Sequence, residues 1–418
     1  MKYRKYKICF LYGLLALFLF SACDSLGLDK SAKTRTILVY VAANNSLSGD
    51  AAYNYSQMLT GMKSVDARNN LLVYMRTPTA ACLLKLSHSG NEVTRVDTVK
   101  TYSQNQNSAN SSVMASVMKD AFNAYPADNY GLILWSHGVG WIPFCLSGES
   151  STTASSYGTR SIIVDGGGYS DNTYSMYINT LKSTLSSVGV HFDFIMSDAC
   201  YMQDIETAYE LKDVTDYVIG SPFEIASDGA PYQRVVPFMF ADADNEEEYV
   251  KNIAKVYYTY YHSDEDPNGW STGVCLSVVK CSELDKLASL TGKILASGSA
   301  RADTLKANIK NRLSNIQYFD PIYYSDVHFS YDMEDAISRV ADASSLSAWE
   351  TQLAATVVWN GKEPYAYSEL CKGDVTINSD CGLGMYIPVA SSNAVTNQWN
   401  TFYQTLDWYN DAGMNVLF

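Results

Sequence analysis

One histidine and one cysteine occupy matching positions in this 418-residue chain, each just beyond an apolar run. His137 follows Tyr130–Ser136 in the segment W-S-H-G-V-G, and Cys200 follows Phe192–Ser197 in S-D-A-C-Y-M. If both runs are strands of one parallel sheet, the two side chains lie beyond the carboxyl ends of the strands, where open sheets bind ligands. A thiol beside an imidazole forms a nucleophile with its general base. The spacing therefore predicts covalent catalysis.

Two neighbouring features would assist such a nucleophile. A helix expected over 200–211 would place Cys200 at a helix N-terminus, where the macrodipole lowers the pKa of a thiol. Gly138 carries no side chain, so its backbone N–H could point at a developing oxyanion. Taken singly, Cys200 could instead be a buried inert cysteine and His137 a hydrogen-bonded core histidine.

The elements that would position these residues alternate between strands and helices. Near-continuous apolar runs predict buried strands at 36–43, 70–76, 130–136, 192–197 and 217–221. Helices are expected at about 50–63, 109–124 and 174–187, and a hairpin over 82–99. This order predicts a parallel sheet covered by helices.

Beyond about residue 245 the pattern becomes mostly helical. Helices are expected at 246–262, 281–296, 303–315 and 347–358, and strands near 272–280 and 382–388. We expect 36–280 to form the core, and 281–418 to complete the sheet and add a mostly helical subdomain. The stretch 145–173 is dense in Ser, Thr and Gly and predicts a flexible loop of functional importance.

Three segments resemble the clostripain family of cysteine peptidases, which shares a clan with caspases, gingipains and legumain. They are Tyr130–Gly140 (YGLILWSHGVG), Asp198–Gln203 (DACYMQ) and Ser221–Tyr232 (SPFEIASDGAPY). The resemblance extends from about residue 36 to 260, and more loosely to the C-terminus. It implies a caspase-like three-layer α/β/α sandwich with a largely parallel central sheet.

The resemblance also implies roles for individual residues. His137 would be the general base and acid, Cys200 the nucleophile, and the backbone amides of Gly138 and Cys200 the oxyanion hole. Asp198 and Asp228 would line an S1 pocket for Arg or Lys before the cleaved bond, and a carboxylate suits a guanidinium. Asp198 could instead orient or cap a neighbouring element, and Asp228, which precedes a glycine, could be a turn residue.

Other positions depart from the family or extend the comparison. Tyr201 and Gln203 stand where members often have Leu and Gly, and Glu224 is a weaker candidate for the pocket. Family members mature by cutting themselves after a basic residue, and Arg160 is the basic residue between 138 and 181. No cofactor is required for the chemistry. Some family members depend on calcium, and Asp165 and Asp171 could supply oxygen ligands, but nothing has EF-hand spacing and the sequence leaves the metal open.

The N-terminus resembles a bacterial lipoprotein signal. Residues 1–22 combine a basic start with the apolar run Ile8–Ala22, and Cys23 follows as the lipidation site. Residues 23–35 would be a tether, so the body is expected in the cell envelope, attached to the membrane by lipid. An uncleaved anchor is the alternative. Seven cysteines remain beyond Cys23, and an odd number in an exported chain indicates at least one free thiol.

Composition and motifs exclude several other classes. The formal net charge is −14 and no basic stripe is present, so we expect no nucleic-acid partner. The absence of C-x-x-C and H-x-x-x-H argues against structural zinc and zincins. Residues 269–273 match G-x-S-x-G, but a polar loop precedes them and an apolar strand follows, unlike a nucleophile elbow. We expect a monomeric endopeptidase acting on proteins or peptides; the alternative is a surface-binding lipoprotein with a silent peptidase-like fold.

Overall fold

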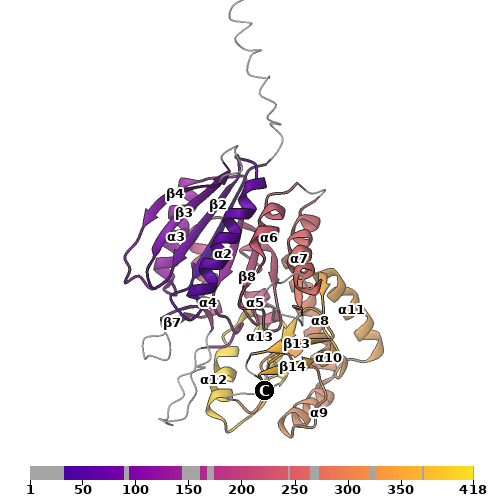
Figure 1. The fold of residues 1–418 in the computed structure, drawn as a ribbon. Helices are drawn as coiled ribbons and strands as arrows, with labels where there is room; N and C mark the ends of the chain where they lie inside the picture. The colour runs from indigo at the N-terminus through magenta and orange to yellow at the C-terminus, as the bar shows by residue number, and fades with distance from the viewer. Residues whose placement is uncertain are drawn as a thin grey trace, which may run out of the picture. The chain divides into compact units, whose positions relative to one another are not determined.

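A nine-stranded sheet runs through the described part of the chain, in the order β12-β10-β9-β8-β5-β1-β2-β3-β4. Figure 1 shows its strands β2, β3, β4 and β8 among the helices. The computed structural model describes residues 33–88, 94–143, 161–166, 174–242, 245–263, 273–320, 325–369 and 371–417. The strands of the sheet are β1 (Arg35–Ala42), β2 (Asn70–Arg76), β3 (Ala81–His88), β4 (Thr94–Thr101), β5 (Asn129–Trp135), β8 (Phe192–Asp198), β9 (Thr215–Gly220), β10 (Leu276–Lys280) and β12 (Val357–Gly361).

The centre of this sheet is parallel and its two sides are antiparallel. Strands β2, β1, β5, β8 and β9 run in one direction. The hairpin β3–β4 extends the sheet beyond β2, and β10 and β12 extend it beyond β9. The largely parallel sheet expected from the sequence is therefore confirmed.

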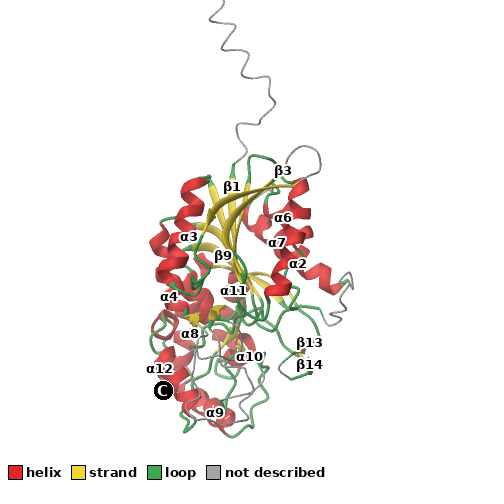
Figure 2. Ribbon diagram, turned by 60° about the vertical axis from the view of Figure 1, so that its left-hand side comes forward, coloured by secondary structure: helices red, strands yellow, loops and turns green. Residues whose placement is uncertain are grey.

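Helices cover both faces of the sheet, as Figure 2 shows. One face is covered by α2 (Ser48–Gly61), α6 (Tyr232–Met239) and α7 (Glu246–His262), and the other by α3 (Ser111–Ala124), α4 (Ile178–Val188) and α5 (Ile205–Leu211). The three-layer α/β/α architecture is thus confirmed.

Strand β1 shows why the sheet needs helices on both sides. Successive side chains of a strand point to opposite faces. Ile37, Val39 and Val41 enter the core beneath α2, α6 and α7, and Leu38, Tyr40 and Ala42 enter the core on the opposite face. All six are at most 1% exposed. Because full burial of a large apolar side chain contributes about 1.5–3 kcal/mol, this strand is stable only with both faces covered.

The C-terminal part continues the core on the α3–α4–α5 side. Its helices are α8 (Leu284–Ser297), α9 (Ser299–Lys310), α10 (Met333–Ser338), α11 (Ala343–Thr356), α12 (Ala394–Tyr403) and α13 (Asp407–Asp411). Short 3-10 helices are η1 (Met62–Ser64), η2 (Cys281–Glu283) and η3 (Met414–Leu417). The small two-stranded sheets pair β6 (Ile162–Asp165) with β7 (Tyr174–Met176), β11 (Tyr331–Asp332) with β15 (Gly384–Met385), and β13 (Tyr365–Ser368) with β14 (Gly373–Thr376).

Two expected helices begin later than the sequence indicated. The helix expected from 174 begins at Ile178, because Tyr174–Met176 pairs with β6 instead. The helix expected over 200–211 begins at Ile205, because the Tyr201 and Gln203 amides donate to the carbonyls of Phe223 and Ser221. Residues 201–203 are therefore held in a turn.

Several expectations concern residues outside the described ranges. These include the signal segment 1–22, the lipidation site Cys23, the loop residue Arg160 and Ser271 of the G-x-S-x-G match. Within the described residues, no helix combines the length and apolar character needed to cross a bilayer. The six cysteines that the structure describes, Cys82, Cys200, Cys275, Cys281, Cys371 and Cys381, are all free thiols.

Asp204 makes the stability of the fold depend on pH. Its Oδ1 accepts a 2.6 Å hydrogen bond from the Thr207 amide and so caps α5. Burial raises the pKa of this carboxyl to about 7. The folded state therefore keeps a proton that the unfolded chain releases above about pH 4, so the contribution to stability is lost as the pH rises from about 4 to 7.

We expect Asp204→Asn to reduce this loss, because asparagine is also a good N-cap and does not ionise. The difference in Tm between pH 5 and pH 8 should shrink by a few degrees, roughly, relative to the wild type. Thermal unfolding at both pH values measures it, with Asp242→Asn, at an exposed aspartate, as the control. An unchanged pH difference in Asp204→Asn would contradict this assignment.

Candidate active site

The register between β5 and β8 aligns the two candidate catalytic residues. Trp135 of β5 lies opposite Asp198 of β8 in a parallel pairing. His137 and Cys200 each follow two residues later, so both leave the sheet at its carboxyl edge. The chain moves from β1 to β2 on one side and returns to β5 on the other, which makes this edge the topological switch point where open α/β sheets bind ligands.

His137 contacts the loop that follows β1. Its Nε2 lies 2.9 Å from the hydroxyl oxygen of Ser46, and the imidazole is half-buried. Three strand ends, those of β1, β5 and β8, thus contribute to one site. Ser46 was not singled out in the sequence, although its place just beyond the first strand was a usable signal.

The environment of Cys200 differs from the sequence-based expectation. Its Sγ lies 4.0 Å from the carbonyl oxygen of Ile225. Burial, followed by the negative charge of Glu224, raises the pKa of the thiol to about 12. The expectation that a helix N-terminus lowers this pKa is wrong, because α5 begins five residues later. A raised pKa favours the neutral thiol at neutral pH, so the expected general base, His137, would have to accept its proton.

Gly138 packs directly against the turn that carries the cysteine. A Cβ atom at this position would lie 2.9 Å from the Ala199 Cβ, 3.0 Å from the Cys200 carbonyl oxygen and 3.0 Å from the Met202 Sδ. Gly138 also pairs with Ile162 in an antiparallel bridge. The backbones of the two proposed oxyanion-hole residues are therefore neighbours, and a side chain does not fit between them.

The segment Ser161–Gly166 is hydrogen-bonded to the loop that carries His137. The Val164 amide donates to the Ser136 hydroxyl over 3.0 Å, and the Asn45 side-chain amide donates to the Val164 carbonyl over 2.9 Å. The Val139 amide donates to the Ser161 carbonyl over 3.2 Å. The residues that directly follow Arg160 in the sequence are therefore hydrogen-bonded to the loop that carries His137.

Asp165, which the sequence suggested as an oxygen ligand for calcium, is bound by donors of the protein. Its Oδ1 accepts from the Asn44 side-chain amide at 2.7 Å, and its Oδ2 accepts from the Ser108 amide and hydroxyl at 2.6 and 2.7 Å. Arg76 lies 3.5 Å from Oδ2, and both charged side chains are buried. Both carboxylate oxygens therefore have partners within the protein, and calcium binding stays a prediction. Asp171 lies outside the described residues.

Asp198 is the buried centre of a hydrogen-bond network. It is 3% exposed and accepts hydrogen bonds from the Tyr232 hydroxyl at 2.7 Å, the Tyr257 hydroxyl at 3.1 Å and the Ala230 amide. Burial raises the pKa of this carboxyl, whereas the three donors lower it. Asp198 thus holds the loop that contains Asp228, in agreement with the alternative role considered for it.

The loop with Asp228 is fixed at each of its residues. Asn54 of α2 donates to the Asp228 carbonyl over 2.7 Å, and the Tyr261 hydroxyl donates to the Gly229 carbonyl over 2.6 Å. Gly229 has a φ of +60°, and a Cβ there would lie 2.8 Å from Asp198 Oδ2. A glycine is therefore required. The Asp228 side chain itself is half-buried.

Helix α2 contributes a further acidic residue that the sequence reasoning missed. Asp50 lies one helical turn before Asn54, on the same face of the helix. Burial and the negative charge of Asp228 both raise the pKa of Asp50. Asp50 and Asp228 therefore form an acidic pair beside the loop of Asp228.

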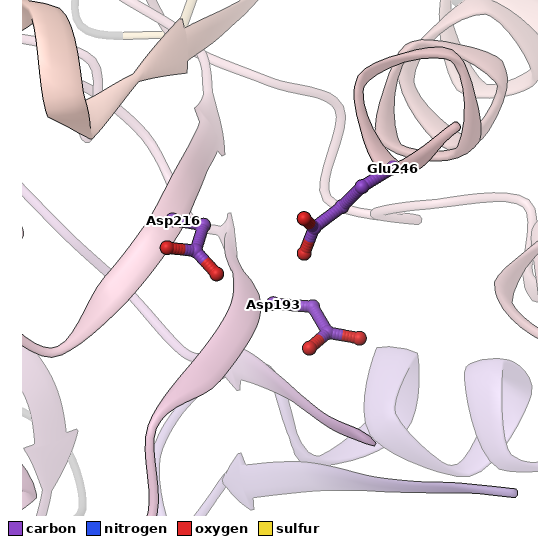
Figure 3. A group of neighbouring side chains, drawn as sticks. All are labelled: Asp193, Asp216 and Glu246. Atoms are coloured by element: carbon purple, nitrogen blue, oxygen red, sulfur yellow. The ribbon is translucent and has the colours of Figure 1, made fainter. Parts of the chain in front are cut away.

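A separate group of carboxylates lies at the opposite end of the sheet. Asp193, Asp216 and Glu246 offer oxygen atoms within 4.8 Å of one another (Figure 3). Asp193 accepts from the Asn129 side-chain amide at 2.8 Å, and Asp216 contacts His191 at 3.0 Å. Because these residues start β8, β9 and α7, they are remote from the carboxyl edge with His137 and Cys200.

The profile of the Clostripain family matches residues 39–415. The chain belongs to the clostripain family of cysteine peptidases. It is therefore a cysteine peptidase that acts on peptide substrates, and the family resemblance seen in the sequence is confirmed. No curated protein matches the chain in sequence.

Solved structures of clostripain-family proteases resemble this one. A secreted C11 cysteine protease from Bacteroides thetaiotaomicron, in complex with an irreversible peptide inhibitor, is 32% identical, with a TM-score of 0.75, over 91% of this chain and 99% of that chain. An inactive zymogen C11 protease from Parabacteroides distasonis is 32% identical, with a TM-score of 0.72, over 90% of this chain and 97% of that chain.

We expect Gly138→Ala to lower kcat/KM by about 100-fold without unfolding the protein, because the new methyl group would displace the Cys200 turn from the oxyanion position. Steady-state assays and thermal unfolding measure the two effects. Gly49→Ala is the matched control, since a Cβ there meets nothing within 4 Å. Full activity of Gly138→Ala would exclude close packing at this position.

The raised pKa of Cys200 predicts its alkylation profile. Because the thiolate is the reactive form, the rate of alkylation of Cys200 by iodoacetamide should rise continuously between pH 7 and pH 10. Mass spectrometry of the Cys200 peptide measures this rate, with exposed Cys371 as a reference for access of the reagent. A plateau below about pH 8.5, the ordinary pKa of a cysteine, would contradict it.

Proposed function

We propose that this clostripain-family enzyme is an exported, lipid-anchored endopeptidase that cleaves after Arg or Lys, with Cys200 as the nucleophile and His137 as the general base and acid. The observation that carries the proposal is the β5–β8 register, which brings His137, Gly138 and Cys200 to one edge of the sheet. The acidic residues around Asp228 support the preference for a cationic side chain.

The chemistry follows from these positions. His137 takes the thiol proton, and the Cys200 sulfur attacks the peptide carbonyl to form a tetrahedral intermediate. The amides of Gly138 and Cys200 stabilise its oxyanion. His137 then protonates the leaving amine, which leaves a thioester on Cys200. Water, deprotonated by His137, hydrolyses the thioester and restores the thiol. Each step uses only groups of the chain and water, so no cofactor is required.

The carboxylates of the proposed S1 pocket have different roles. Asp228, whose side chain is half-buried, is the proposed direct partner of the substrate guanidinium or ammonium. Asp198 already accepts hydrogen bonds from Ala230, Tyr232 and Tyr257. Its proposed role is therefore indirect: it holds the loop of Asp228 in place and adds negative charge to the pocket. Asp50 adds charge from α2.

Maturation and location complete the proposal. Cleavage after Arg160 would occur directly before Ser161–Gly166, the segment bonded to the His137 loop, and a similar protease is described as an inactive zymogen. Lipidation of Cys23 would anchor a monomeric enzyme to the membrane. The sequence Lys2–Cys23 and the description of a related protease as secreted support export. Calcium dependence is proposed only as a condition to test.

Fluorogenic peptides test the reaction directly. Residues 24–418 should hydrolyse peptides ending in Arg or Lys but not in Asp or Leu, and Cys200→Ala and His137→Ala should each lose at least about 1,000-fold in kcat. Cleavage of the chain near Arg160, seen by gel electrophoresis in the wild type but not in Cys200→Ala, would show self-processing. If no peptide is hydrolysed, with calcium or with chelator and after limited trypsin treatment, the proposal is contradicted and the non-catalytic surface lipoprotein is favoured.

Asp228→Asn tests the pocket. Loss of a charge-assisted contact should lower kcat/KM for Arg and Lys peptides by roughly 10- to 100-fold, mostly through KM. Asp242→Asn, at an exposed aspartate beyond α6, is the matched control and should leave the kinetics unchanged. Unchanged kinetics of Asp228→Asn would remove Asp228 from the pocket but leave the nucleophile assignment intact.

A further inference from the structure

A buried carboxylate connects the nucleophile turn to the C-terminal part. Glu224 is 6% exposed. Its Oε1 accepts hydrogen bonds from the Tyr201 hydroxyl at 2.9 Å and the Ser368 hydroxyl at 2.6 Å, and its Oε2 accepts from the Glu369 amide at 2.9 Å. A buried carboxylate is stable only with such donors, so the three contacts depend on one another.

Tyr201 directly follows the nucleophile and has an unusual backbone. Its φ of +57° lies in the left-handed region, which few residues other than glycine adopt. The Tyr201 amide donates to the Phe223 carbonyl over 3.0 Å, and the ring packs edge-on against Phe223 and Phe329. The side chain is 2% exposed. Its packing and its bond to Glu224 therefore hold a backbone turn that the residue would not adopt alone.

The donors on the other side of Glu224 come from the hairpin β13–β14. Ser368 is fully buried at the end of β13 and also accepts the Cys371 amide at 3.1 Å. Glu224 is in turn adjacent to Ile225, whose carbonyl oxygen contacts the Cys200 sulfur. The Glu224 carboxylate thus joins a hairpin more than 140 residues away in sequence to Tyr201, and Glu224 itself precedes Ile225, which contacts the Cys200 sulfur.

We propose that Glu224 is a positioning residue for the nucleophile, which fixes the Cys200 turn through Tyr201 and ties it to the β13–β14 hairpin. The inference rests on the assignment of Cys200 as the nucleophile. The hairpin therefore holds the site from a part of the chain that contributes no reacting group.

The charge of Glu224 also acts on the thiol. After burial, it is the largest cause of the raised pKa of Cys200, and Asp198 adds a smaller effect of the same sign. The other titratable groups near this turn are His137 at the β5 end, Tyr201 itself, and Asp320, whose charge acts on Tyr201. Removing the charge of Glu224 and removing its bond to Tyr201 should therefore have different effects on the thiol.

Two variants separate these effects. Glu224→Gln removes the charge, so alkylation of Cys200 by iodoacetamide at pH 8 should become about tenfold faster. Tyr201→Phe removes only the hydroxyl, so alkylation should not accelerate, whereas kcat on an Arg peptide should fall about tenfold with KM within twofold. Tyr209→Phe is the matched control: its hydroxyl also donates to carboxylates, Asp285 and Asp411, at 3.0 and 2.8 Å, at the far end of α5.

The outcomes distinguish the inference from the function on which it rests. If Cys200→Ala keeps its peptidase activity, the nucleophile assignment fails. If Cys200 is essential but both variants lower only the Tm, with kcat and alkylation as in the Tyr209→Phe control, Glu224 is structural and the inference is wrong. Should Tyr201→Phe fail to fold, Ser368→Ala loosens the same carboxylate from the hairpin side and carries the same expected fall in kcat.

Discussion

The parallel pairing of β5 with β8 is the constraint on which the site depends. Because Trp135 and Asp198 are register partners, the next residues of both strands leave the sheet at the same edge, which places His137, Gly138 and Cys200 there. Strand β1 adds Ser46 on the other side of β5. The backbone hydrogen bonds of the sheet, whose strands are buried on both faces, thus determine the geometry of a site that itself consists of loops.

Buried carboxylates surround this edge and give the site its electrostatic character. Asp198 and Glu224 both lie near the thiol, and both raise its pKa in addition to the effect of burial. A thiol held in its neutral form is a weak nucleophile, so in the proposed mechanism its attack depends on proton transfer to His137 in the complex with substrate. In the proposed S1 pocket, the same negative potential would favour a cationic substrate side chain at Asp228. In this proposal, attraction of the substrate and protonation of the nucleophile have one physical origin.

The C-terminal part belongs to the catalytic unit. Its helices extend the core on one face of the sheet, and β12 pairs with β10 as an edge strand. Its β13–β14 hairpin supplies Ser368 and the Glu369 amide to Glu224. Segments far apart in sequence thus fix the turn at Cys200. Tyr201 keeps its left-handed conformation because packing and hydrogen bonding around it exceed the strain of that conformation.

The sequence alone determined the periodic elements and the candidate dyad. Two-sided apolar strands require a helix-covered sheet, and strand ends show where His137 and Cys200 must lie. Only the tertiary structure decided what depends on distant partners. Residues 201–203 pair with 221–223 and delay α5, so the expected helix-terminus effect on Cys200 is absent. Asp165 contacts Arg76 and Ser108, and Asp198 accepts hydrogen bonds from two tyrosines. Secondary-structure propensity depends on residues that are neighbours in the sequence. Burial and hydrogen-bond partners depend on segments that come together only in the folded protein.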